Sequence, residues 1–427
     1  MQFFAALVII ALAVYGLVRQ VEVRLTLFTA GLALATLALK PLVIFEVFLA
    51  EMGNGKTIGP ICTAMGYAYV LRATGCDREL VQRLLAPARR TWWLLIPGGC
   101  LAGFIANIAI TSQTAVAAAV GPILVPLMLA AGYPAGAAAA TLVLGCSGGG
   151  SLYNPGDADL VAIQEASQAP MKQALGAMFW PLLGGFATAV SVFSLLTRRQ
   201  PGSEPIPCAA LPATAASSHW KALLPPLPMA MIFLAMPGFV FHSLPAPFEK
   251  GLPVSHAMIL ATIVVLILCR GELTAQVRAF FEGLGYAYAN IISLIVTASC
   301  FIAGMTEVGL TQRLVDLASS EGIGGKLAAG FFPGVLGVIT GSGIGPSVAF
   351  SKAVLPGLRD NLALALDLGV LAAIAATFGR TMSPAAAVVI FSANQAGVPA
   401  TEIVRRTAFP LIAGLVVALL LIVARGN

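Results

Sequence analysis

The chain has 427 residues, of which 59% are hydrophobic and only 10% are charged, and its mean hydropathy is +0.93. This composition excludes a soluble globular protein and indicates a polytopic membrane protein with roughly ten spans of about 20 residues each. The net charge of +6 does not indicate a nucleic-acid partner, because the basic residues lie in short loops between apolar segments. The seven cysteines lack metal or redox spacing, which favours packing roles.

The first half of the chain predicts spans, a hairpin and a broken span. Polar, glycine-rich and proline-containing backbone interrupts apolar sequence twice, and lipid tolerates this only where that backbone is buried in protein or lines a cavity. The expected segments are spans at 3–18, 25–41 and 57–72, an interfacial arginine-rich stretch at 77–90, a re-entrant hairpin at 92–131 with its tip at Ser112-Gln113-Thr114, a span at 134–165 broken at 146–155, and a span at 172–196.

A polar, proline-rich stretch at 197–222 is expected to be a cytoplasmic linker, and the second half then follows a similar order. We therefore divide the chain into a first repeat at 1–196 and a second repeat at 223–427. The expected segments of the second half are spans at 223–243, 254–269 and 288–305, a polar stretch at 309–326, a hairpin at 327–357 with its tip at Ser342-Gly343, a span at 361–395 broken at 377–384, and a span at 404–424.

The spacing of the motifs indicates an internal repeat. Ser112 and Pro126 lie 230 positions before Ser342 and Pro356, and Gly150 lies 229 positions before Gly379. Each half has five spans and one hairpin, so the second half is expected to run inverted across the membrane. With the N-terminus outside, 14 basic residues fall inside and 8 outside, which agrees with the positive-inside rule.

Two basic residues remain at membrane depth, Lys352 and Arg380. An arginine there is costly unless it is paired or faces water, and its planar guanidinium can hold a carboxylate through two parallel hydrogen bonds. We therefore predict that Arg380, which follows Gly379 in the second break, binds an anion. The alternatives are a structural ion pair, for example with Asp367, or capping of carbonyls at the break. Lys352 is expected to extend towards the outer surface.

The hairpin tips and breaks would bring helix termini and hydroxyls to the middle of the membrane, where N-termini favour anions and carbonyls favour cations. Ordinary helix packing explains any single serine, but not matched clusters in both halves. Asn154 is expected to line the site, whereas Asp157 and Asp159 could equally be solvated. The predicted substrate-binding residues are Arg380, Ser112, Gln113, Thr114, Ser342, Gly343, Gly379, Thr381, Ser383 and Asn154, and the predicted cation-binding residues are Ser112, Gly149, Ser151, Ser342 and Thr377.

The segments Thr340 to Pro346, Phe378 to Pro384 and Val404 to Thr407 resemble the C-terminal half of the DcuC family of anaerobic C4-dicarboxylate carriers, and the first half is similar in layout. The resemblance implies the ion transporter superfamily, with inverted repeats, a dimerising scaffold and an elevator-like transport domain that holds two opposed hairpins. In that superfamily the tips carry Ser-Asn-Thr-like signatures. These map onto Ser112-Gln113-Thr114 and imperfectly onto Ser342-Gly343-Ile344, which lacks the amide and the final hydroxyl.

We therefore expect an all-α homodimeric secondary transporter of the bacterial inner membrane, which carries succinate, fumarate or malate by exchange or coupled movement. No cofactor or metal site is expected, and the coupling ion would be Na⁺ or H⁺. Alternative substrates are monocarboxylates, tricarboxylates and amino acids, and an anion channel is a second class. An intramembrane enzyme is disfavoured, because the spans lack a paired His/Asp/Glu or Ser/Lys constellation.

Overall fold

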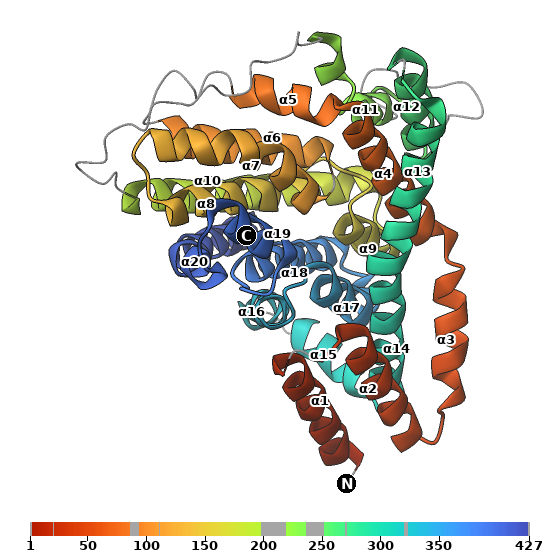
Figure 1. The fold of residues 1–427 in the computed structure, drawn as a ribbon. Helices are drawn as coiled ribbons and strands as arrows, with labels where there is room; N and C mark the ends of the chain where they lie inside the picture. The colour runs from red at the N-terminus through yellow and green to blue at the C-terminus, as the bar shows by residue number, and fades with distance from the viewer. Residues whose placement is uncertain are drawn as a thin grey trace.

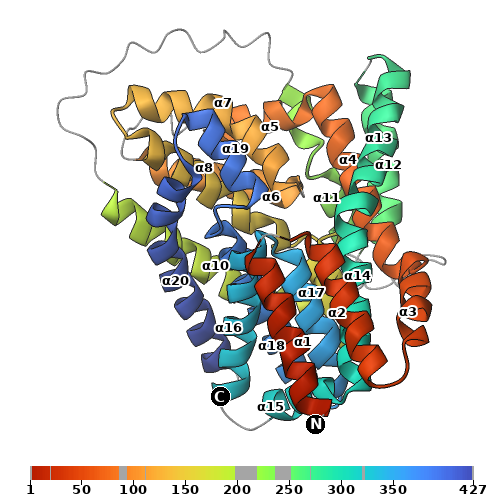
Figure 2. The ribbon, with the colours of Figure 1, turned by 60° about the horizontal axis from the view of Figure 1, so that its bottom comes forward.

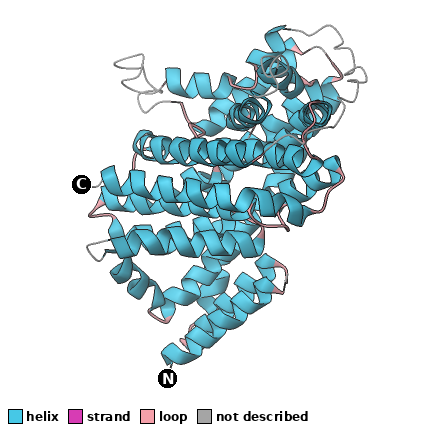
Figure 3. Cartoon of the chain, turned by 90° about the vertical axis from the view of Figure 1, so that its left-hand side faces the viewer, coloured by secondary structure: helices cyan, strands magenta, loops and turns pink. Residues whose placement is uncertain are grey.

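A computed structural model describes residues 2–19, 21–85, 94–110, 112–197, 219–235, 252–269, 271–319 and 323–425. Within these ranges the chain is helical, without a strand, as the cartoon in Figure 3 shows. Long runs of apolar side chains favour helices because each helix satisfies its own backbone hydrogen bonds in lipid. Five described helices are long and apolar enough to cross a membrane, namely Gln113–Ala130, Met171–Leu196, Leu273–Glu307, Leu362–Thr381 and Ala400–Arg425.

The first half follows the predicted order and adds one helix. Its helices are α1 (Gln2–Val18), α2 (Val23–Leu37), α3 (Leu42–Met52), α4 (Gly55–Thr74), α5 (Cys76–Leu85), α6 (Leu95–Ala109), α7 (Gln113–Ala130), α8 (Ala135–Gly148), the 3-10 turn η3 (Gly149–Ser151), α9 (Ala158–Ser167) and α10 (Met171–Leu196). Helix α3 was not predicted, because the expected spans 25–41 and 57–72 left the residues between them without an element.

The second half begins in the described structure with a short turn. Its elements are η4 (His219–Leu223), α11 (Leu227–Leu234), α12 (Val254–Leu268), α13 (Leu273–Ala287), η5 (Tyr288–Ile292), α14 (Ser293–Glu307), α15 (Leu310–Ser319), α16 (Ile323–Thr340), α17 (Ile344–Val354), η6 (Leu355–Leu358), α18 (Leu362–Thr381), α19 (Ala387–Ala396) and α20 (Ala400–Arg425). Residues 198–218 of the predicted linker and 236–251, which include part of the predicted span 223–243, lie outside the described residues.

The bounds of one predicted span in this half were wrong. The expected span 288–305 is the second part of a continuous helix that begins at Leu273 and ends at Glu307. The predicted spans 254–269 and 288–305 left the segment 273–287 without an element, yet it forms α13, which packs against α4. The polar stretch 309–326 contains α15, and α16 begins at Ile323 rather than at 327.

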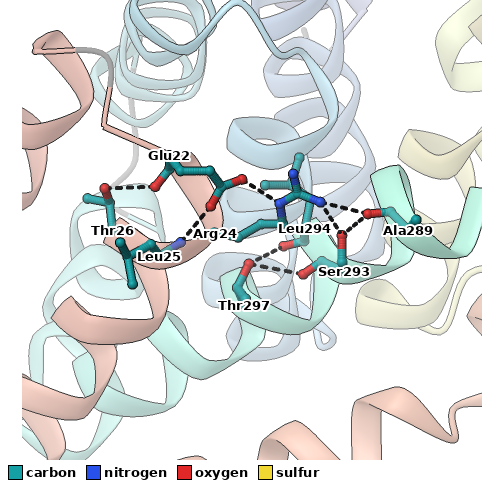
Figure 4. Close-up of polar contacts among 8 residues, drawn as sticks. All are labelled: Glu22, Arg24, Leu25, Thr26, Ala289, Ser293, Leu294 and Thr297. Atoms are coloured by element: carbon teal, nitrogen blue, oxygen red, sulfur yellow. Dashed lines mark hydrogen bonds and ion pairs between the residues drawn. The ribbon is translucent and has the colours of Figure 1, made fainter.

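The long helix contains a π-helical turn, η5, between α13 and α14. A π-turn withdraws carbonyls from the α-helical pattern, so they require other donors. Figure 4 shows Arg24 of α2 filling this role: its Nη1 donates to the carbonyl of Ala289 at 2.7 Å and to Ser293 Oγ at 3.1 Å. Glu22 holds the guanidinium from the other side, 2.5 Å from Nε. Helix α2 is thereby fixed to the middle of the long helix.

The two halves interlock around their broken helices (Figure 1). Helix α9, which follows the first break, packs against α17 and α18 of the second half, and α19, which follows the second break, packs against α7 and α8 of the first. Helices α10 and α20 pack against each other along one side. Both described ends of the chain lie at the same end of the molecule in Figure 2.

Close approach of glycines sets the helix spacing near the breaks. A Cβ atom on Gly149 would lie 2.0 Å from the carbonyl oxygen of Phe104, and one on Gly379 would lie 2.1 Å from that of Gly334. Small residues allow helices to approach this closely in membranes, where packing rather than hydrophobicity drives association. The hairpin α6–α7 is therefore seated on the first break, and α16 on the last turn of α18.

Candidate functional site

The second hairpin tip lies against the last turn of α18. Gly341 connects α16 to α17 with a φ of +66°, a left-handed conformation that glycine adopts without strain. A Cβ on Gly343 would lie 3.4 Å from the carbonyl oxygen of Ala376 and from the Cα of Thr377. The polar residues of the tip and those at the end of α18 are thus brought together by backbone packing.

Arg380 belongs to the last turn of α18, which ends at Thr381. The sequence placed it inside the break, so this detail was wrong: the break begins after α18 and runs to Ala386, where α19 is capped. The guanidinium Nη2 donates to the carbonyl oxygen of Ser147 in α8 at 3.3 Å, while Nε is buried without a hydrogen-bond partner. A buried donor that lacks a partner is a position where a ligand oxygen could bind.

The first hairpin tip reaches the same carbonyl. Gln113 Nε2 donates to Ser147 O at 3.0 Å, so Gln113 and Arg380 meet there although they come from opposite halves. Ser112 caps α7, since its Oγ accepts the N–H of Ala115 at 3.3 Å. The N-terminus of α7 therefore points towards the region in which Arg380 lies, and helix N-termini favour anions.

The first break is held by two asparagines. Asn107 of α6 accepts the N–H of Gly150 at 2.8 Å and donates to the carbonyl of Ile110 at 3.1 Å, which fixes η3 to the tip of its own hairpin. Asn154 accepts the N–H of Gly156 at 3.1 Å, and its Nδ2 is buried without a partner. Sequence reasoning missed Asn107, although an amide inside an apolar hairpin arm is the signal that could have found it.

Other predicted residues use their hydroxyls locally. Thr381 donates to the carbonyl of Thr377 at 2.7 Å, and Ser383 Oγ accepts the N–H of Ala385 at 3.3 Å. Ser342 bonds through its backbone to the Thr340 hydroxyl at 3.2 Å. These contacts stabilise the tip and the break. No contact of the Thr114 side chain tests its predicted binding role, which stays a prediction.

The residues predicted to bind a cation fall into two groups, one in each half. Ser112, Gly149 and Ser151 belong to the first tip and break, whereas Ser342 and Thr377 belong to the second tip and the end of α18. Within the described residues, no group of three or more His, Cys, Asp or Glu side chains could hold a metal ion. The cation sites therefore stay predictions.

Two aspartates that the sequence left open belong to the site. Asp157 occupies the N-cap position of α9, and Asp159 lies in the first turn of that helix with a residue exposure of 3%. Their charges and that of Arg380 interact with one another. The acids that accompany Arg380 therefore come from the first half of the chain. They lie just after the first break, whereas Arg380 lies just before the second.

The ion pair suggested between Arg380 and Asp367 is not formed. Asp367 Oδ2 lies 3.5 Å from Lys326 Nζ, at the other end of α18. The expectation that Lys352 extends to the outer surface was also wrong, because its Nζ lies 2.7 Å from Glu51 Oε1 and 3.1 Å from Ser299 Oγ. Lys352 thus joins α17 to α3 and α14.

A cavity of about 540 Å³ lies beside the first break, between α4, α9 and the start of α12. Its polar lining includes Lys56, Gln164 and Glu165, and Pro155 forms part of its wall, whereas Arg380 does not line it. Glu165 also accepts hydrogen bonds from Asn54 and Thr57 of α4, both at 2.7 Å. The cavity thus reaches the break beside α4.

Comparison with known proteins identifies the family to which this chain belongs. Residues 37–426 match the family model described as the C4-dicarboxylate anaerobic carrier, DcuC. The chain belongs to the DcuC family. The family resemblance inferred from the motifs is confirmed, and the family consists of transporters rather than enzymes. Membership of this bacterial family and the apolar spans place the chain in the inner membrane.

Named relatives support this assignment. The anaerobic C4-dicarboxylate transporter DcuC of Escherichia coli K12 is 24% identical over 402 residues, which cover 88% of this chain and 83% of that protein. An uncharacterized transporter of Haemophilus influenzae is 33% identical over 187 residues, 44% of this chain and 66% of that protein. Both alignments connect this DcuC-family chain to transporters.

Two solved structures share the fold of this DcuC-family chain. The YdaH transporter of Alcanivorax borkumensis superposes with a TM-score of 0.61 at 16% sequence identity, covering 90% of this chain and 89% of that one. MtrF of Neisseria gonorrhoeae, described among antimetabolite efflux pumps, gives a TM-score of 0.56 at 15% identity, with 89% and 84% coverage. At these identities the likeness concerns the fold alone.

Proposed function

We propose that this protein is a secondary transporter of C4-dicarboxylates such as succinate, fumarate and malate, which works by exchange or cation-coupled alternating access. The observation that carries the proposal is Arg380, whose buried Nε has no partner and which lies where both halves meet. Arg380 would hold one carboxylate through parallel hydrogen bonds. The N-terminus of α7 and the polar groups of the tips would hold the other.

The architecture supports alternating access. The interlocked hairpins and broken helices, 95–167 and 323–396, would form the moving unit, which we call the transport unit. We place α1–α4 and α12–α14 in a scaffold, and infer that the two halves are inverted repeats. Exposed apolar side chains such as Phe4, Ile267 and Phe409 would face lipid or a second copy in a homodimer.

The test is counterflow in proteoliposomes. Vesicles preloaded with succinate, fumarate, citrate, lactate or aspartate are given labelled succinate outside, with and without sodium and pH gradients. We expect accumulation driven by internal succinate or fumarate, but not by lactate or citrate. Accumulation driven by citrate or an amino acid instead would assign another substrate to the site. Flux that does not saturate and shows no exchange would indicate a channel.

The contacts between scaffold and transport unit predict a second result. Asn54 Nδ2 of α4 lies 2.7 Å from Glu165 Oε1 of α9, at the edge of the cavity. If the transport unit moves, a short bifunctional thiol reagent that joins Asn54→Cys to Glu165→Cys should abolish counterflow, because the two helices can no longer separate. The double variant without the reagent should remain active.

A matched control lies within the scaffold. Lys40 Nζ and Glu307 Oε2 are also 2.7 Å apart, and both residues belong to the part that we expect to stay fixed. Joining Lys40→Cys to Glu307→Cys should therefore leave counterflow intact. Unchanged exchange in protein fully cross-linked between residues 54 and 165 would show that α9 does not move relative to α4.

A further inference from the structure

The charges of three side chains interact at the first turn of α9, and these charges do not balance. Arg380 carries one positive charge, whereas Asp157 and Asp159 would together carry two negative charges. Both carboxyls contain an oxygen, Oδ2 of Asp157 and Oδ1 of Asp159, that is buried without a hydrogen-bond partner. Asp157 does accept from the Ser151 hydroxyl and from backbone N–H groups of α9, but these bonds add no positive charge. Two ionised carboxylates buried beside one guanidinium are therefore disfavoured.

A neighbouring hydroxyl oxygen is also buried without a hydrogen-bond partner. Ser347 of α17 is fully buried and faces Asp159, yet its Oγ has no hydrogen bond of normal geometry. An ionised Asp159 could only accept from this hydroxyl. A protonated Asp159 could instead donate to it, so the hydroxyl can pair with either state of the carboxyl. The site thus has the partner that an added proton needs.

The other charged groups around α9 do not correct the imbalance. Lys56 of α4 and Lys352 of α17 interact with Glu165 at the far end of the helix, and Arg359, which follows η6, donates to the carbonyl of Ala166 at 3.1 Å. Lys172 at the start of α10 is exposed. Among the described charged groups, Arg380 of α18 is therefore the cation that faces Asp157 and Asp159.

We propose that Asp157 and Asp159 form a proton-binding pair that shares Arg380 with the transported dicarboxylate. Without substrate, one proton on the pair makes the three side chains neutral overall. A dianion that binds Arg380 adds two negative charges beside the remaining carboxylate, so binding draws a second proton onto the pair. A metal cation is disfavoured beside the pair, because the guanidinium of Arg380 would repel it. A proton instead binds covalently to a carboxyl and removes its charge.

This inference rests on the proposed function and predicts a pH dependence of binding. Uptake of one proton with each substrate molecule changes the apparent Kd about 10-fold per pH unit, with weaker binding as pH rises. Fumarate is the appropriate probe, because both of its carboxyls are ionised over the range used. By reciprocity, fumarate should also raise the proton affinity of the pair.

The experiment measures fumarate binding to the purified wild-type protein by titration calorimetry between about pH 6 and pH 8.5, in two buffers of different ionisation enthalpy. The difference between buffers gives the number of protons taken up, which we expect to approach one. Counterflow of fumarate is measured in parallel. Active counterflow combined with pH-independent binding and no proton uptake would overturn the proton pair alone, whereas absence of counterflow with every C4 acid would overturn the proposed function.

Variants locate the proton. Asp159→Asn and Asp157→Asn are close in shape to the wild type, and at least one should bind fumarate with a Kd that no longer depends on pH. That variant should also lose uptake driven by a pH gradient. Glu402→Gln, a half-exposed acid of α20 paired with Arg406, should retain the wild-type slope. Wild-type slopes in both aspartate variants, or sodium replacing protons at high pH, would contradict the assignment.

Discussion

Replacing Arg380 with lysine is expected to lower C4-dicarboxylate counterflow at subsaturating substrate by about 30-fold or more, equivalent to about 2 kcal/mol of binding. Lysine keeps the charge that faces Asp157 and Asp159, so the fold should persist. It loses the planar fork, however, and a single ammonium cannot form two parallel bonds to a carboxylate while it also reaches Ser147 O.

The matched control is Arg406→Lys in α20. Arg406 is half-exposed and pairs with Glu402 one helical turn away, at 3.0 Å. Pairs of this kind contribute little, so the same substitution there should leave exchange and thermal stability near wild type. Wild-type counterflow in Arg380→Lys would remove Arg380 as the carboxylate anchor and favour a purely structural role for its contact with Ser147.

The second large effect concerns stability. Gly379→Ala should destabilise the protein by about 3 kcal/mol and lower its apparent melting temperature in detergent, because the new Cβ would lie 2.1 Å from the carbonyl oxygen of Gly334. Backbone cannot yield as a side chain can, so α16 and α18 would have to separate. Counterflow should fall as well, since Arg380 is the next residue.

The control lies in the same interface. A Cβ on Gly330 of α16 would meet only side-chain atoms of Leu371, at 3.7 Å, which is ordinary contact. Gly330→Ala should therefore leave the melting temperature unchanged or raise it slightly, because alanine favours the helix. Equal melting temperatures for the two alanine variants would show that α16 and α18 are not held at the distance described here.

The sequence predicted the local structure of the site well because its signals are local. Glycine, serine and proline in apolar sequence indicated the tips near Ser112 and Ser342, and both separate two helices in the structure. Arg380 was conspicuous as a charge in an apolar run. The apolar runs were a poorer guide to helix bounds: the predicted span began at residue 288, yet α13 packs against α4 and the helix begins at Leu273.

The partners of charged residues could not be predicted, because they depend on how distant segments meet. Asp367 shares a helix with Arg380 and was a reasonable partner, but the two lie at opposite ends of α18, and Lys326 takes the nearer position. The acids near Arg380 come from α9 in the other half. The interlocking of α9 with α17 and α18 decides this arrangement, and no spacing along the chain encodes it.

The π-turn in the long helix has a consequence for register. An α-helix turns by about 100° per residue, so the extra residue accommodated at η5 changes the face that α14 presents relative to α13. One continuous helix can thereby pack α13 against α4 and α14 against α2, where Gly304 and Gly31 touch. Deleting one residue from 288–292 would rotate α14 away from α2 and leave Arg24 without its carbonyl. The one extra residue at η5 thus allows a single continuous helix to pack against both α4 and α2.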